Sequence, residues 1–274
     1  MRTLTLVSWN LHGLPLISGR RERFRRIAAR VLDADADVVL FQEVWMHGDA
    51  GQLARDLDVS YEPVPGPTDR LPGRASGLLS FVRRSTGWTI RTSRFHRFTT
   101  KAPAWKIWEG DGLGRKGVQE IHLEGDGTSV LLLNTHLQAS YPWNSYEPVR
   151  RPQLAQLCDL MQRMDHRWPV IAGGDLNTRA SEHLYQELLT HWSDLTAGTR
   201  QQSGRGTHFH RSGVEGDWID YILARRHDSW SVSADDVRLI ENTKPDVPYS
   251  DHQGLHARLR IHPREHSTPK RFPT

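Results

Sequence analysis

Four short polar segments follow apolar runs of this chain, and their residue types suit chemistry on a phosphate group. The runs before the first three, TLTLV, DVVLF and PVIAG, are rich in β-branched residues and predict buried strands. Their polar ends supply Asn10, Glu43, Asp175 and Asn177. Because rigid scaffolds present binding groups at strand ends and in the loops that follow, the pattern predicts one shared site. The four segments are SWN at 8–10, FQEVW at 41–45, GGDLNT at 173–178 and SDH at 250–252.

The carboxylate and amide side chains of these segments match the ligands of a hard divalent cation. Oxygen atoms of Glu43, Asn10 and Asp251 suit Mg²⁺ or Mn²⁺, which keep several of their own waters and need few protein ligands. Glu43 is the strongest candidate, since a charge directly after the apolar run DVVLF is costly to leave unpaired. The alternative is an ordinary ion pair between Glu43 and a nearby arginine.

GGDLNT places Asp175 and Asn177 together on a turning backbone, and its glycines let that backbone approach a substrate. An aspartate followed two positions later by an asparagine is also typical of a plain Asx turn. The three other segments, each at a predicted strand end, favour the functional interpretation. In that interpretation Asp175 activates a water for attack on phosphorus, and Asn177 donates a hydrogen bond to a phosphate oxygen.

Two of the 15 histidines stand out by position. His252 in SDH is suited to proton exchange near neutral pH, and Asp220 in WIDYIL is the best partner to fix its tautomer. His136 closes the apolar run SVLLLNTH and is predicted to hydrogen-bond the scissile phosphate, with a structural strand-end histidine as the alternative. Whether His252 acts as base or acid stays open, as does the number of metal ions.

The elements that must position these side chains alternate between strands and helices. Such an order predicts an α/β or α+β layered fold, and the order by itself does not separate the two. Strands are predicted at 3–9, 37–42, 77–83, 88–93, 117–123, 129–135, 169–175, 218–224 and 254–261, and helices at 20–33, 50–57, 149–164 and 181–190.

Length and composition predict one large domain. The chain has 274 residues, 37% of them hydrophobic, which suffices for a sizeable core. We assign residues 1–262 to a single catalytic domain and 263–274 to a basic, flexible tail. A net charge of +4 would attract a phosphate-bearing partner, either nucleic acid or an anionic membrane surface. The single Cys158, and a start that lacks a signal-peptide pattern, predict a cytoplasmic protein without a transmembrane segment, expected to be a monomer.

Together these residues resemble the endonuclease/exonuclease/phosphatase superfamily, from Trp9 to about Ala257. The resemblance implies a four-layered α/β sandwich, DNase I-like, with two mixed sheets face to face, helices outside and an active site at one sheet edge. It also assigns roles to matching positions. Asn10 and Glu43 match the metal site, Asp175 and Asn177 the pair that binds attacking water and phosphate, Asp220 and His252 the catalytic pair, and Asp251 the acid beside that histidine.

Further stretches resemble the neutral sphingomyelinase branch of that superfamily. These are NTHLQASY with the following SYEPVRRPQLAQL, and WEGDGLGRKGVQEIHL, which places Lys116 where it would meet a lipid head-group phosphate. The alternative for Lys116 is a solvated lysine in a hairpin turn. Trp105, Trp108 and Trp143 lie in predicted loops and suit a peripheral membrane contact, or else ordinary packing.

Three functions compete at this stage. The first is a metal-dependent, sphingomyelinase-like phospholipid phosphodiesterase that works by in-line attack of water on phosphorus. The second is a magnesium-dependent nuclease acting on DNA or RNA, and the third a non-catalytic binding module. The chain departs from the family pattern before IDY, where an arginine is usual and this sequence has Asp217–Trp218. Two alternatives for Asp217 are metal binding and an ion pair with Arg211.

Overall fold

Two six-stranded mixed sheets make up the centre of the molecule in the computed structural model, which describes residues 1–15, 17–66, 76–103, 114–141, 143–209, 216–241 and 249–264. The first sheet has the order β11(Trp230–Ile240), β12(Gly254–Pro263), β1(Arg2–Asn10), β2(Val38–Gln42), β4(Leu79–Arg83) and β3(Tyr61–Pro63). The second has the order β5(Thr89–Arg97), β6(Gly117–Gly125), β7(Thr128–His136), β8(Val170–Asp175), β10(Asp220–Arg225) and β9(Trp192–Asp194).

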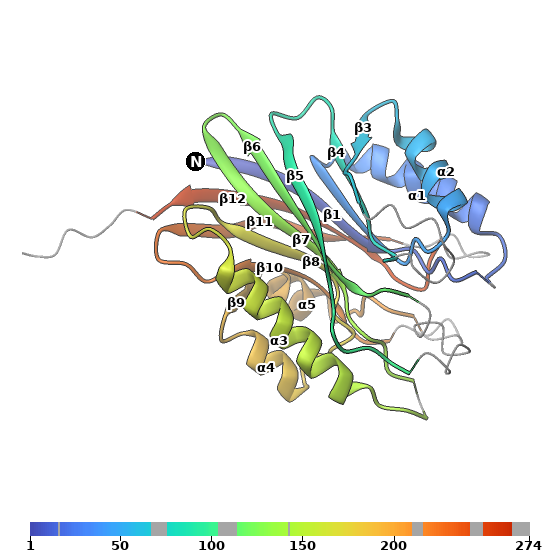
Figure 1. Cartoon of the computed structure of the whole chain (residues 1–274). Helices are drawn as coiled ribbons and strands as arrows, with labels where there is room; N and C mark the ends of the chain where they lie inside the picture. Colours follow the sequence, from blue (N-terminus) through green and yellow to red (C-terminus); the bar gives the residue numbers. More distant parts are fainter. Residues whose placement is uncertain are drawn as a thin grey trace, which may run out of the picture.

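Helices lie outside both sheets (Figure 1). The first sheet carries α1(Arg20–Ala34) and α2(His47–Leu57), and the second carries α3(Glu147–Arg163), α4(His183–Leu188) and α5(Ala197–Ser203). None of the helices within the described ranges is long and apolar enough to cross a membrane. The predicted α/β sandwich of two face-to-face mixed sheets with outer helices is confirmed.

Side-chain alternation along the central strands creates the two apolar layers of the sandwich. In β1 and β2, the buried Leu6 and Leu40 belong to the core between the two sheets. Their neighbours Val7 and Phe41 point the other way, into the core beneath α1 and α2. Since successive side chains of a strand face opposite sides, strands covered on both faces must be apolar at every position. This explains the continuous apolar runs in the sequence.

Each sheet contains one parallel pair of strands, and these two pairs position the polar segments. β1 runs parallel to β2 with Asn10 opposite Gln42, and β7 runs parallel to β8 with His136 opposite Asp175. β10 is antiparallel to β8, so Asp220 at its start lies opposite Asp175. β12 is antiparallel to β1, so the SDH segment before β12 reaches the same edge. All four segments therefore converge on one edge of the sandwich.

Most predicted elements are present, with ends shifted by a few residues. β3, β9, α5 and the long edge strand β11 were not predicted. β11 is half exposed and carries Asp235, Asp236 and Arg238, so it lacks the apolar signal of a central strand. The domain assignment stays a prediction, and the tail from residue 265 onward lies outside the described residues, as do Trp105 and Trp108.

Gly174 in β8 is required by the close approach of β7. Its φ is 151°, and a β-carbon there would lie 1.9 Å from the carbonyl oxygen of Thr135. We expect Gly174→Ala to lower the free energy of unfolding by about 3 kcal/mol or more, because the backbone of the neighbouring strand cannot move away cheaply. Urea unfolding measures this loss.

Gly198→Ala is the matched control for this substitution. A β-carbon at Gly198 in α5 would meet nothing within 4 Å. Alanine there should leave stability unchanged or raise it by up to about 1 kcal/mol. Equal stability of the two variants would show that the spacing of β7 and β8 does not depend on Gly174.

Candidate active site

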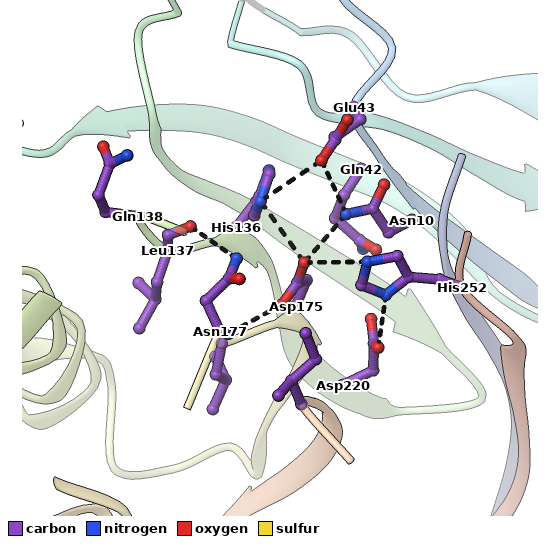
Figure 2. Close-up of polar contacts among 12 residues, drawn as sticks. Asn10, Gln42, Glu43, His136, Leu137, Gln138, Asp175, Asn177, Asp220 and His252 are labelled. Carbon is purple, nitrogen blue, oxygen red and sulfur yellow. Dashed lines mark hydrogen bonds and ion pairs between the residues drawn. The ribbon is translucent and has the colours of Figure 1, made fainter. Parts of the chain in front are cut away.

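Asn10 joins the two sheets at the convergent edge. Its amide nitrogen donates to Glu43 Oε1 at 3.1 Å and to Asp175 Oδ2 at 3.0 Å, so it holds one carboxylate from each sheet (Figure 2). Its amide oxygen accepts the backbone N–H of His12 at 3.0 Å. The predicted neighbourhood of Asn10, Glu43 and Asp175 is therefore present. The amide nitrogen of Asn10, rather than its oxygen, faces the two acids.

Backbone strain is concentrated at this edge. Five described non-glycine residues have a positive φ, and three of them are His12 at 48°, Glu43 at 60° and Asn177 at 48°. Each follows a central strand and turns its side chain back toward the shared edge. Left-handed backbone is costly for residues with a β-carbon, and such strain persists mainly where surrounding contacts enforce it, often at functional sites.

Asp175 is the hub of the site and is 1% exposed. Its Oδ1 accepts the backbone N–H of Asn177 at 2.8 Å, which is the predicted Asx turn. Its Oδ2 lies 3.5 Å from His136 Nε2 and 3.7 Å from His252 Nε2, and Figure 2 shows both imidazoles pointing at this carboxylate. The predicted Asx turn is therefore present, and it leaves the second carboxylate oxygen of Asp175 facing the site.

His252 and Asp220 form the predicted pair. His252 Nδ1 lies 2.8 Å from Asp220 Oδ2, and both side chains are buried. The backbone of His252 is held as well, since its carbonyl accepts from Trp9 Nε1 at 2.9 Å and its N–H donates to Ser250 Oγ at 3.1 Å. Asp220 therefore determines which nitrogen of His252 faces Asp175, and that nitrogen is Nε2.

The charges of the three central groups follow from burial and from one another. The pKa of Asp175 is raised to about 7, chiefly by burial and next by the negative charge of Asp220, while the charge of His252 opposes both. Burial alone would lower the pKa of His252, but Asp220, with Asp175 and Asp251, outweighs it and holds that pKa well above the ordinary value. Burial and the charge of Lys116 lower the pKa of His136 well below its ordinary value. At neutral pH His252 is thus a cation and His136 is neutral.

Lys116 lies inside the site, and its alternative as a solvated hairpin lysine is wrong. It is 3% exposed, and its ammonium lies 2.9 Å from His136 Nε2 and donates to the carbonyl of Leu137 at 2.7 Å. The same carbonyl accepts from Asn177 Nδ2 at 3.1 Å. Because an ammonium only donates, His136 Nε2 must accept, and the ring proton of neutral His136 lies on Nδ1. This arrangement makes Lys116, rather than His136, the cationic donor of the pair.

The donor set fits a hard divalent cation. Glu43 and Asp175 share the amide of Asn10, and Asp220 Oδ1 is buried without a hydrogen-bond partner among the described residues. Carboxylate oxygens in this number are the ligands that Mg²⁺ prefers. Asp251 lies slightly apart, 3.3 Å from His12 Nδ1 and 3.9 Å from His252 Nε2. Asp251, His208 and His252 form one group whose possible ligand atoms all lie within 4.8 Å of one another. Asp175, Asp220 and His252 form a second such group.

Several neighbours of the site were not singled out from sequence. His12 and His208 flank Asp251 and His252, and His208 reaches them because residues 207–209 pair with the SDH segment. Beneath the site, a buried polar layer connects the sheets. Gln42 Nε2 donates to Asn134 Oδ1 at 2.9 Å, and Asn134 Nδ2 donates to Ser80 Oγ at 3.0 Å. Two polar residues inside otherwise apolar runs, Gln42 in VVLFQ and Asn134 in VLLLNT, were the available signal.

The unusual Asp217–Trp218 pair has a structural explanation. Asp217 forms an ion pair with Arg179 at 2.7 Å, and Arg179 follows Asn177 by two positions. Trp218 is 5% exposed and belongs to the core between the sheets. The expected partner Arg211 lies outside the described residues. Asp217 therefore fixes an arginine at the rim of the site.

Comparisons with known proteins show the family of this chain. The model of the Endonuclease/Exonuclease/phosphatase family matches residues 7–252. The inositol phosphosphingolipids phospholipase C of Schizosaccharomyces pombe is 30% identical over 179 residues, which is 64% of this chain and 41% of that protein. A putative neutral sphingomyelinase of Caenorhabditis elegans is 26% identical over 298 residues, covering 95% of this chain and 67% of that protein.

A solved structure shows the same fold. The crystal structure of D. rerio TDP2 complexed with a single-strand DNA product superposes with a TM-score of 0.76, at 19% identity, and covers 95% of this chain and 100% of that one. The family match includes every segment that supplies the edge, from β1 to His252. The chain therefore belongs to the endonuclease/exonuclease/phosphatase family of phosphoester hydrolases.

Proposed function

We propose that this chain is a sphingomyelinase-like phospholipid phosphodiesterase, which hydrolyses the bond between the head-group phosphate and the alcohol of the lipid. The observation that carries the reaction is the position of Asp175, whose Oδ2 faces cationic His252 and the His136 ring that the buried ammonium of Lys116 contacts. The substrate class rests on two relatives named for sphingolipid phosphodiesterases, one of which aligns with 95% of the chain.

The residues divide the chemistry between them. Asp175 accepts a proton from the attacking water through the carboxylate oxygen that faces the site. As the water oxygen bonds to phosphorus, the bond to the leaving alcohol breaks, and the alcohol oxygen takes its proton from cationic His252. Asp220 holds His252 in place through the 2.8 Å contact to Nδ1. Lys116 and the amide of Asn177 then donate to the phosphate oxygens.

Mg²⁺ or Mn²⁺ is the proposed cofactor. Glu43 and Asp175 would hold it, with Asp251 contributing from the His12 side. Asn10 would orient both carboxylates rather than offer its oxygen, because that oxygen already accepts the N–H of His12. When bound, the cation neutralises negative charge on the phosphate oxygens.

A substrate panel tests the proposal. Hydrolysis of sphingomyelin, phosphatidylcholine, plasmid DNA and bis-p-nitrophenyl phosphate is measured with magnesium and with chelator. We expect magnesium-dependent cleavage of the soluble diester and of sphingomyelin. Cleavage of plasmid DNA with no lipid hydrolysis would overturn the lipid assignment and identify a nuclease. Inactivity on all four substrates with magnesium and with manganese would favour a binding module.

Magnesium should stabilise the protein more at alkaline than at acidic pH. Because the pKa of Asp175 is about 7 when folded, against 3.8 ordinarily, the folded state binds this proton more tightly. This group therefore costs stability as pH rises from its ordinary pKa toward 7, and that cost is removed when a cation favours the ionised form. We expect the Mg²⁺-induced rise in Tm to be larger at about pH 8 than at about pH 5.5. A pH-independent rise would contradict the involvement of Asp175.

A further inference from the structure

Two exposed apolar side chains follow strands that end at the edge that carries the site. Among the described residues, the large hydrophobic side chains that are exposed are Met1, Met46, Val59 and Trp143. Met46 follows β2 and Trp143 follows β7, and these strands end at the site edge. Trp143 has the largest side chain of the four and is 68% exposed. An indole so exposed needs a reason, because tryptophan is ordinarily well buried in folded proteins.

The described residues around Trp143 hold one another in place. Its ring stacks on Tyr141 with centroids 5.7 Å apart and an angle of 19°, and Tyr141 meets Tyr146 edge to face at 6.3 Å. Two backbone hydrogen bonds close the turn, from Tyr141 N to Asn144 O at 3.0 Å and from Asn144 N to Tyr141 O at 2.9 Å. We call Tyr141, Trp143 and Tyr146 the aromatic turn.

The base of the aromatic turn is anchored in the fold. Tyr146 is 4% exposed, its N–H donates to Ser140 Oγ at 3.0 Å, and it precedes the first residue of α3. The buried guanidinium of Arg150 in α3 donates to the carbonyl of Gln138 at 3.3 Å and also bonds Ser140. In Figure 1 the segment between β7 and α3 projects beyond the first turn of α3. Trp143 is thus presented at a fixed position, and Leu137, six residues earlier, contacts Lys116 and Asn177.

The charges near the aromatic turn are paired with one another. Arg150 forms an ion pair with Glu182 at 3.2 Å, and Arg151 pairs with Glu147 at 2.9 Å and with Glu187. A surface that follows a nucleic-acid strand needs cations directed at successive phosphates. An element that enters the head-group region of a lipid layer needs an aromatic ring with an apolar body and a polar N–H on a nearly neutral surface. The aromatic turn resembles the lipid-contact element rather than the nucleic-acid surface.

We propose that the aromatic turn is a membrane-contact element, which inserts Trp143 into the head-group region of a zwitterionic phospholipid surface. This deepens the proposed function and rests on it for the identity of the substrate, but the contact itself is a separate property. Since Leu137 and Trp143 belong to one anchored segment, insertion of the ring brings the phosphate-binding side chains to the lipid surface without a change in the fold.

Vesicle binding tests the inference. Binding to phosphatidylcholine vesicles is measured by sedimentation in the presence of chelator, so the result does not depend on hydrolysis. We expect Trp143→Ala to weaken binding by roughly tenfold, the size expected when one large apolar side chain is no longer buried. Trp143→Phe should restore part of the binding. Because Trp143 is 68% exposed, circular dichroism should show that both variants are folded.

Val59→Ser is the matched control. Val59 is 80% exposed and precedes Tyr61, which pairs with Arg83 at the end of β4 remote from the site. Val59→Ser removes an exposed apolar side chain from the end of the sheet opposite the site and should leave vesicle binding unchanged. If Val59→Ser weakens binding as much as Trp143→Ala does, contact through the aromatic turn is wrong.

A fluorescence measurement isolates the ring itself. The chain has 10 tryptophans, so the quenching by bromine-labelled phosphatidylcholine is compared between wild type and Trp143→Phe. We expect most of the quenching to disappear in the variant. Equal quenching would overturn the inference, as would a Trp143→Ala variant that loses affinity for a single-stranded oligonucleotide but not for vesicles. Vesicle binding through Trp143 without sphingomyelin hydrolysis would instead leave the contact intact and refute the proposed substrate.

Discussion

Asp175→Asn should lower kcat on the soluble diester by roughly 10²- to 10⁴-fold, the range for loss of a positioned general base. Asparagine retains the shape of the side chain and can still accept the backbone N–H of Asn177, which now lies 2.8 Å from Asp175 Oδ1. It cannot accept a proton from water. Its amide nitrogen would then face the donating Nδ2 of Asn10, which now lies 3.0 Å from Asp175 Oδ2, so Tm is measured beside kcat.

Asp194→Asn separates this effect from a general loss of structure. Asp194 in β9 is also a buried acid, and it accepts from Tyr185 at 2.7 Å and from Arg200 at 2.7 Å, away from the site edge. This control should lower Tm while leaving kcat per folded molecule unchanged. Steady-state kinetics with thermal unfolding measures both. An Asp175→Asn variant that keeps most of its activity would assign the base to another residue.

Much of the site edge was predictable because its signals are local. Glu43 and Asp175 each end a continuous apolar run, and such a run predicts a central strand of a sheet covered on both faces. Once β1 is parallel to β2 and β7 to β8, the ends of all four strands must lie at common edges. The pairing of His252 with Asp220 is not local, since 32 residues separate them, and it was predicted because Asp220 is an acid inside an otherwise apolar run.

The remaining features depend on how the two sheets meet, which no single segment encodes. The burial of Lys116 follows from its place before β6, beside His136 on β7. Its sequence neighbourhood of glycine and arginine left a solvated hairpin lysine open as the alternative to a phosphate contact. The orientation of the Asn10 amide is decided by a backbone N–H two residues away and by carboxylates from both sheets. The edge strand β11 was missed because it pairs with a strand on one side only and its charged side chains reach solvent.

Glu43→Gln should raise the magnesium concentration needed for half-maximal activity by about 100-fold or more, since loss of an outer-shell partner alone costs 10- to 100-fold in metal affinity. The variant retains the hydrogen bond from Asn10, because the glutamine oxygen can accept it at the present 3.1 Å. It removes one of two carboxylates bonded to the same amide, so the metal-free protein should lose none of its stability while the Mg²⁺-induced rise in Tm disappears.

Glu120→Gln is the control, because its side chain is 16% exposed against 15% for Glu43 and pairs with His96 away from the site. Titrations of activity and of Tm with Mg²⁺ distinguish the two variants. If Glu43→Gln responds to Mg²⁺ as the wild type does, the cation is held by the group of His208, Asp251 and His252 instead.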